Sequence, residues 1–318
     1  MPVRLVTPGN GRTRDERHDD AAVRAPSRAS PSGAKPPEIE PFGAALQVSR
    51  LLSDLDERFA NLTRAARRVR DQADDEAVHD LRVASRRLIA ACDVWQGALR
   101  RRPTRTLRRR LRRLRRRAGA VRDLEVHVAR LRELRSALTG PPRELAVYAL
   151  GGLEPEAAVA VERIRRRLRP RTLRPLAAGY ARATNDLRER AGDAFISAMA
   201  ARGELEGRST QARIALRPAL ESGDPELLHA ARVSVKKWRY AAEALSGVEL
   251  LPADAEPVRA LRKLQQALGR IQDAGTLVAR LEAVLPAGSS RAVLLGELAR
   301  ESAESLALAR VAAQDLRP

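Results

Sequence analysis

The sequence VHDLRVASRRLIAACDVW, residues 78–95, holds the pattern that decides the fold. On a helical wheel of about 100° per residue, His79, Arg82 and Arg86 fall in one narrow stripe, with Arg87 nearby. The apolar residues fall on the opposite side of the wheel, namely Leu81, Leu88, Cys92 and Trp95. The stretch therefore predicts an amphipathic helix that buries its apolar side in a bundle and presents a line of hydrogen-bond donors.

A similar pattern begins 150 residues later, in LHAARVSVKKWRYAAEAL, residues 228–245. Its basic stripe consists of His229, Arg232, Lys236 and Lys237, with Tyr240 beside them. A second pair of segments, LRRLRRRAGAVRDLEVHVARL from residue 111 and LRKLQQALGRIQDAGTLVARL from residue 261, matches at the same offset. Two matches at one offset indicate duplication of a helical unit.

The second pair of segments has apolar residues three and four positions apart, which is typical of a bundle seam. These residues are Leu111, Leu114, Ala118, Val121 and Val128, and then Leu261, Leu264, Leu268, Ile271 and Val278. Gly119 and Gly269 interrupt the helices at a cost of about 1 kcal/mol each, so we expect a neighbouring helix to approach closely there. Asp123 and Asp273 either orient an arginine of the first repeated helix or are ordinary surface carboxylates.

The rest of the chain predicts an all-α protein, because no segment alternates like a strand. Residues 1–41 are rich in Pro, Ser and Gly without periodicity, so we expect a disordered tail. Residues 42–318 form the helical domain, with half one at about 42–170, a connector at about 171–191 and half two at about 192–318. Breaks are expected near residues 103, 140–142, 151–155, 170, 222–225, 252 and 286–290.

The charge of the chain predicts a polyanionic partner. Sixty Lys and Arg against forty Asp and Glu give a net charge of +20, and twelve of the eighteen residues at 100–117 are arginine. Codon bias explains the choice of arginine over lysine, but it leaves the excess of positive charge unexplained. The single cysteine, Cys92, excludes an internal disulfide, and no apolar span or secretion signal is evident, so a cytoplasmic location is expected.

The same residues argue against catalysis, a metal and a cofactor. The four histidines lack a second ligand at close helical spacing, and the chain has neither a carboxylate cluster for Mg²⁺ nor a Gly-rich phosphate loop. His79 and His229 are either core residues or hydrogen-bond partners that stay neutral beside the cations. The alternative for the basic stripe is a solvated face paired with acids, but only Asp93 and Glu243 lie near it.

These paired blocks, with V/L-H-x-x-R-V-x-x-[RK]-[RK] followed by a helix ending in G-x-x-x-D, resemble the conserved histidine α-helical domain (CHAD) family over about residues 42–318. The resemblance implies two four-helix bundles related by pseudo-twofold symmetry, with a basic cavity or groove that holds inorganic polyphosphate. It implies contacts from His79, Arg82, Arg86, Arg87, Arg112, Arg113, Arg116 and Arg122, and from His229, Arg232, Lys236, Lys237, Arg239, Tyr240, Arg262 and Lys263.

The two halves depart from equal contributions, because Gln265, Gln266 and Gln272 stand opposite Arg115, Arg116 and Arg122, and Ile89 stands opposite Arg239. Family members often carry a triphosphate tunnel domain, for which residues 1–41 are too short, so the resemblance implies no catalytic domain. We expect a non-enzymatic protein that binds polyphosphate and targets or organises polyphosphate granules. Nucleic acid is the alternative ligand. It is disfavoured because three Phe, two Trp and three Tyr are too few for base stacking.

Overall fold

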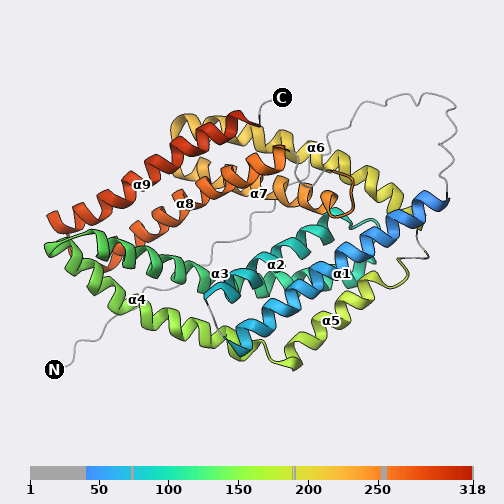
Figure 1. The fold of residues 1–318 in the computed structure, drawn as a ribbon, viewed down its shortest axis with the longest axis horizontal. Coiled ribbons are helices and arrows are strands. Elements are labelled where there is room, and N and C mark those ends of the chain that lie inside the picture. The colour runs from blue at the N-terminus through green and yellow to red at the C-terminus, as the bar shows by residue number, and fades with distance from the viewer. Residues whose placement is uncertain (1–40, 73–74, 188, 190, 252–255, 317–318) are drawn as a thin grey trace, which may run out of the picture. The chain divides into compact units, whose positions relative to one another are not determined.

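The computed structural model describes residues 41–72, 75–187, 189, 191–251 and 256–316, which belong to one compact unit (Figure 1). Within these residues the chain forms nine α-helices and no β-strand, which confirms the all-α prediction. The helices are α1 (Pro41–Asp71), α2 (Asp75–Val94), α3 (Arg101–Ala137), α4 (Gly140–Arg167), α5 (Pro170–Thr184), α6 (Ala191–Ser222), α7 (Pro225–Ser246), α8 (Glu256–Val284) and α9 (Ser289–Gln314). The prediction of a disordered tail concerns residues that lie outside those described.

Local sequence signals determine where the helices begin. Asp224 caps α7, because its carboxylate accepts hydrogen bonds from the backbone N–H groups of Glu226 at 3.0 Å and Leu227 at 2.9 Å. Pro225 occupies the next position, where its fixed φ suits a helix and its missing N–H has no helical partner to lose. Pro103 likewise lies in the first turn of α3, so the chain break falls before this proline, at residues 95–100.

The break predicted at residues 151–155 is wrong, because this segment lies inside α4. Pro155 removes one backbone hydrogen bond, and the two glycines before it favour the unfolded chain. The apolar face of α4 outweighs both effects, since Ala149, Leu150 and Leu153 are buried directly around the glycines. Tertiary packing therefore overrides the local preference for a break.

The buried residues of the described chain form three apolar clusters. The first joins α1, α2 and α5 to parts of α3, α4, α6 and α7, and it contains the fully buried Trp95. The second joins α6, α7, α8 and α9. The third lies between the end of α3, the start of α4, the end of α8 and the start of α9, so that the α3–α4 hairpin packs on the α8–α9 hairpin. The core is almost wholly aliphatic, as the composition predicts.

The segment that the sequence predicts as a connector contains α5, which packs mainly against α3 and also contacts α1. Tyr180 of α5 is 8% exposed and stacks on Phe59 of α1, with ring centroids 4.3 Å apart and planes 6° from parallel. Its hydroxyl donates a hydrogen bond to the carboxylate of Asp56. Burial and this hydrogen bond raise the pKa of Tyr180, so the phenol stays protonated and keeps its role as a donor.

Substitutions of Tyr180 separate the two contributions of this side chain. Y180F keeps the stacked ring and loses the hydrogen bond, so we expect the free energy of unfolding to fall by about 1 kcal/mol. Y180A also loses the buried ring, and the expected decrease is about 3 to 5 kcal/mol. Urea denaturation followed by circular dichroism measures both values, and equal effects of the two variants would contradict the packing described for α5.

Candidate functional site

The basic stripes of the two repeated helices face each other, because α2 and α7 are in contact. Arg86 of α2 donates a hydrogen bond from Nη1 to the Tyr240 hydroxyl of α7 at 3.5 Å. Arg82 and Arg86 lie near enough to Lys236 of α7 for their charges to alter its protonation. The basic residues that meet here are Arg82, Arg86, Arg115, Arg232 and Lys236, which we call the basic cluster.

Members of the basic cluster are largely withdrawn from solvent. The side chain of Arg82 is 19% exposed and that of Arg232 is 14% exposed. Burial, followed by the charge of Arg86, lowers the pKa of Arg82 to about 10. The Nε atom of Arg232 is buried and lacks a hydrogen-bond partner among the described residues. A buried donor of this kind is stabilised when an acceptor reaches it.

Lys236 has the most strongly altered protonation in the basic cluster. Burial is the largest cause, and together with the positive charges of Arg232, Arg86 and Arg82, in that order of importance, it lowers the pKa of Lys236 to about 6. At neutral pH most Lys236 side chains are therefore uncharged. A negative charge brought beside Lys236 would favour its ammonium form.

Two carboxylates offset part of this charge, one from each repeated block. Asp123 of α3 lies 3.9 Å from Arg82, and Asp273 of α8 lies 3.8 Å from Arg232, as measured between Oδ1 and Nη2. Both pairs join equivalent positions of the two repeats, so the aspartates lie where they can orient an arginine. Four charged arginines, with the largely neutral Lys236 among them, face two carboxylates, which leaves an excess of positive charge inside the protein.

The two repeated histidines lie near corresponding positions of α3 and α8, which hold different residues. Partial burial lowers the pKa of His79, and the charges of Arg122 and Arg82 lower it further, so the imidazole is mostly neutral at pH 7. His229 lies 2.7 Å from Gln272, measured from Nδ1 to Oε1. Gln272 occupies the position that corresponds to Arg122, which explains the difference between the two halves.

Several other predicted ligands have acidic neighbours. Arg87 and Arg239 lie 3.4 and 3.5 Å from the carboxylate of Glu243, which is largely buried. Arg112 lies 3.9 Å from Asp93, and Arg122 lies 3.6 Å from Glu125. Arg239 also lies over the ring of Tyr240, at 4.6 Å from its centroid. These arginines therefore surround the basic cluster with part of their charge already compensated.

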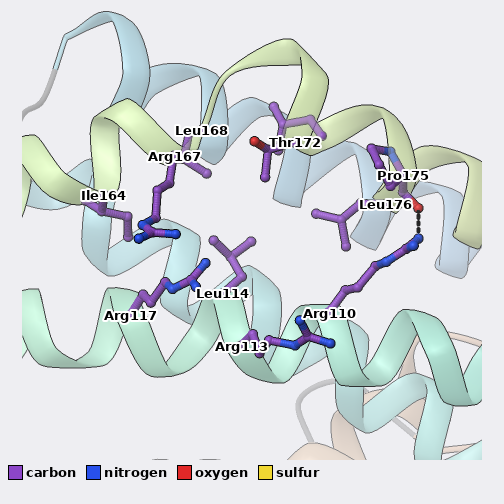
Figure 2. A pocket seen from close by; sticks show the side chains of 11 residues that line it. Arg110, Arg113, Leu114, Arg117, Ile164, Arg167, Leu168, Thr172, Pro175 and Leu176 are labelled. Carbon is purple, nitrogen blue, oxygen red and sulfur yellow. Dashed lines mark hydrogen bonds between the residues drawn. The ribbon is translucent and has the colours of Figure 1, made fainter.

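The remaining predicted residues divide between the cluster and other surfaces. Lys237, Arg262 and Lys263 are exposed on α7 and α8, whereas Arg116 is exposed on α3 near Arg115. Arg113 lies elsewhere, because it lines a cavity between α3, α4 and α5 (Figure 2). Arg115 joins the cluster although it was not among the predicted ligands. Its spacing of seven residues from Arg122, which puts both on one side of α3, was the signal that could have identified it.

The role predicted for the repeated glycines is wrong. A Cβ atom built at Gly119 or Gly269 meets no atom within 4 Å, so no neighbouring helix approaches either position. Both glycines lie one turn before the aspartates that face Arg82 and Arg232. They leave open space beside the backbone of α3 and α8 on the side of the basic cluster.

Two further features of the described residues bear on what this site can hold. No group of three His, Cys, Asp or Glu side chains in the described residues is arranged to bind a metal ion. None of the described helices is long and apolar enough to cross a membrane. The chemistry that the cluster offers is multidentate charge pairing and hydrogen bonding to an anion.

Comparisons with known proteins agree with this architecture. A family model described as the CHAD domain matches residues 53–282. The crystal structure of the CHAD domain from the plant Ricinus communis is similar, with a TM-score of 0.65 and 21% identity over 85% of this chain and 92% of that one. PptA from Streptomyces chartreusis is similar with a TM-score of 0.56 and 22% identity, over 85% of this chain and 98% of that one. No curated protein matches the sequence.

Alanine substitutions test whether the open space at the glycines is real. G119A and G269A should each raise the free energy of unfolding by about 1 kcal/mol, because alanine favours a helix and meets no neighbour. G247A is the contrasting variant, since a Cβ there would collide with the Asp54 carboxylate and lie 2.9 Å from Arg58 Nη2. We expect G247A to lower stability by about 1 to 3 kcal/mol in urea denaturation. Destabilisation by G119A would show that a helix does pack against Gly119.

Proposed function

The chain belongs to the CHAD domain family, and on this basis we propose that it binds inorganic polyphosphate at the basic cluster without catalysing a reaction. The observation that carries the proposal is the meeting of four positively charged arginines and the largely neutral Lys236, from α2, α3 and α7, with only two carboxylates beside them. Mutual repulsion among these cations disfavours the free protein, and a bound polyanion relieves it.

Polyphosphate suits the chemistry of the cluster. Each phosphate unit carries negative charge and oxygen acceptors, and the planar guanidinium groups of Arg82, Arg86 and Arg232 bind two such oxygens at once. The unpartnered Nε of Arg232 and the ammonium of Lys236 supply further donors. The open space at Gly119 and Gly269 gives an unbranched chain room to lie close to the helix backbones.

Burial favours polyphosphate over nucleic acid as the ligand. Arg82 and Arg232 expose less than a fifth of their side chains, so a narrow chain of phosphates reaches them more readily than the phosphates on a wide duplex do. Single-stranded nucleic acid usually also needs aromatic surfaces for its bases. Tyr240, the aromatic residue beside the cluster, is 7% exposed and is covered on one face by Arg239.

The proposal also places the protein in the cytoplasm, in association with polyphosphate granules. A cytoplasmic site fits the single buried thiol, Cys92, which needs no oxidising compartment. A granule surface presents many phosphate chains, so that several copies of the protein can bind to one particle. The excess of positive charge on the whole chain would speed encounter with such a surface.

Removal of the cluster tests the site. The variant R82A/R86A/R232A/K236A should lose at least a hundredfold in affinity for fluorescent polyphosphate, measured by fluorescence anisotropy, and keep its helical circular dichroism spectrum. The matched control R143A/R163A/R171A/R174A removes four exposed arginines from α4 and α5 and should lose less than threefold. Equal losses of affinity in the two variants would show that binding depends only on the net charge of the protein and not on the basic cluster.

Competition distinguishes the ligand classes in the same assay. Unlabelled polyphosphate should displace the labelled chain at a phosphate concentration at least tenfold lower than DNA requires, at fixed ionic strength. Displacement by DNA at an equal phosphate concentration would reject polyphosphate as the preferred ligand. Affinity should also fall steeply with salt, because a linear polyanion releases counterions when it binds.

The altered pKa of Lys236 predicts how binding depends on pH. Lys236 is mostly neutral above pH 6 in the free protein and becomes an ammonium beside phosphate, so binding takes up a proton. Affinity for long-chain polyphosphate should therefore rise as pH falls from 8 to 6, by up to about tenfold per pH unit. K236R keeps a permanent charge and should flatten the profile over this range. An unchanged slope in K236R would assign the proton to another group.

A further inference from the structure

A second group of arginines lies on another flank of α3, around a cavity of about 240 Å³ between α3, α4 and α5 (Figure 2). The apolar lining comes from all three helices, and Leu114, Ile164, Leu168 and Leu176 in it are each less than a tenth exposed. The arginines of the lining are Arg110, Arg113, Arg117 and Arg167. The cavity thus combines an apolar surface with a rim of positive charge.

The charge of this rim lacks local compensation. No acidic residue lines the cavity, and Arg113, Arg117 and Arg167 make no ion pair within the described part of the chain. Figure 2 shows the guanidinium groups of Arg117 and Arg167 turned toward each other near Leu114. Arg110 is held at the other end by donating to the backbone oxygen of Pro175 at 2.6 Å. Like charges beside an apolar surface attract an anion that carries an apolar group.

This site is separate from the basic cluster. On a helical wheel of α3, Arg113 and Arg117 lie within about 40° of each other, whereas Arg115 and Arg122 lie on the opposite flank of the leucine seam. Two sides of the cavity are built by the end of α4 and by α5.

We propose that this cavity binds a small soluble amphipathic anion, in which a phosphate head is joined to one apolar group about the size of an aromatic ring. Ligand pockets usually have volumes of about 300 to 1,000 Å³, so a cavity of about 240 Å³ fits a ligand of this small size. Arg117 and Arg167 hold the phosphate between them. Leu114, Leu168 and Leu176 contact the apolar group.

Phenyl phosphate is the probe that tests this proposal, with inorganic phosphate and phenol as its two separate parts. Isothermal titration calorimetry with the full chain should show phenyl phosphate binding at least tenfold more tightly than either part. R117Q/R167Q should weaken that binding at least tenfold and leave polyphosphate affinity within threefold of the wild type. The matched control R163Q/R174Q removes two exposed arginines from α4 and α5 that do not line the cavity, and should bind as the wild type does.

Three outcomes would overturn the proposal. Equal affinities for phenyl phosphate and inorganic phosphate would show that the apolar surface contributes nothing. Phenyl phosphate binding that R82A/R86A/R232A/K236A abolishes, and that R117Q/R167Q leaves intact, would place the anion in the basic cluster instead. Cosedimentation with phosphatidic acid vesicles, lost in R117Q/R167Q, would identify a lipid head group as the ligand in place of a soluble molecule. The comparison of phenyl phosphate with inorganic phosphate does not involve the basic cluster. Its result would therefore stand even if the protein did not bind polyphosphate.

Discussion

Repulsion between like charges that are withdrawn from water is the constraint on which this structure depends. Arg82, Arg86 and Arg232 meet, with the largely neutral Lys236 among them, because α2 and α7 each bury an apolar side and carry their basic residues on the opposite side. The packing of three aliphatic clusters holds the helices in place against this repulsion. Asp123 and Asp273 reduce it without cancelling it. An excess of positive charge therefore remains in the folded protein.

Much of the fold could be predicted from the sequence, because the signals are local. The seam that starts at Leu111 and Leu114 identified α3, and the Asp224–Pro225 pair fixed the start of α7. The break expected at residues 151–155 failed because glycine and proline act through local backbone preference, whereas the burial of Leu150 and Leu153 depends on helices distant in sequence. No local sequence pattern predicts which side of a helix another helix will cover.

The candidate site was predictable in part for the same reason. Helical spacing grouped Arg82 with Arg86, and Arg232 with Lys236, but their meeting depends on the crossing of α2 over α7. The expectation for Gly119 failed because a glycine in a helix signals that space is needed, without specifying what occupies the space. Arg113 was included among the ligands that the family resemblance implies, although it points about 100° away from Arg112 around the helix and lines the other cavity.

The two halves also differ in what they contribute, since Arg86 and Arg115 of one stand opposite Lys236 and Gln265 of the other. The two ends of an inorganic phosphate chain are chemically identical. An unsymmetrical surface therefore binds such a chain equally well in two opposite directions. That degeneracy favours association by RT ln 2, about 0.4 kcal/mol, over a polymer with chemically distinct ends such as a nucleic acid strand. The arginine-rich side would then determine where the phosphate polymer is held most tightly, and the polymer would run through the site in either direction.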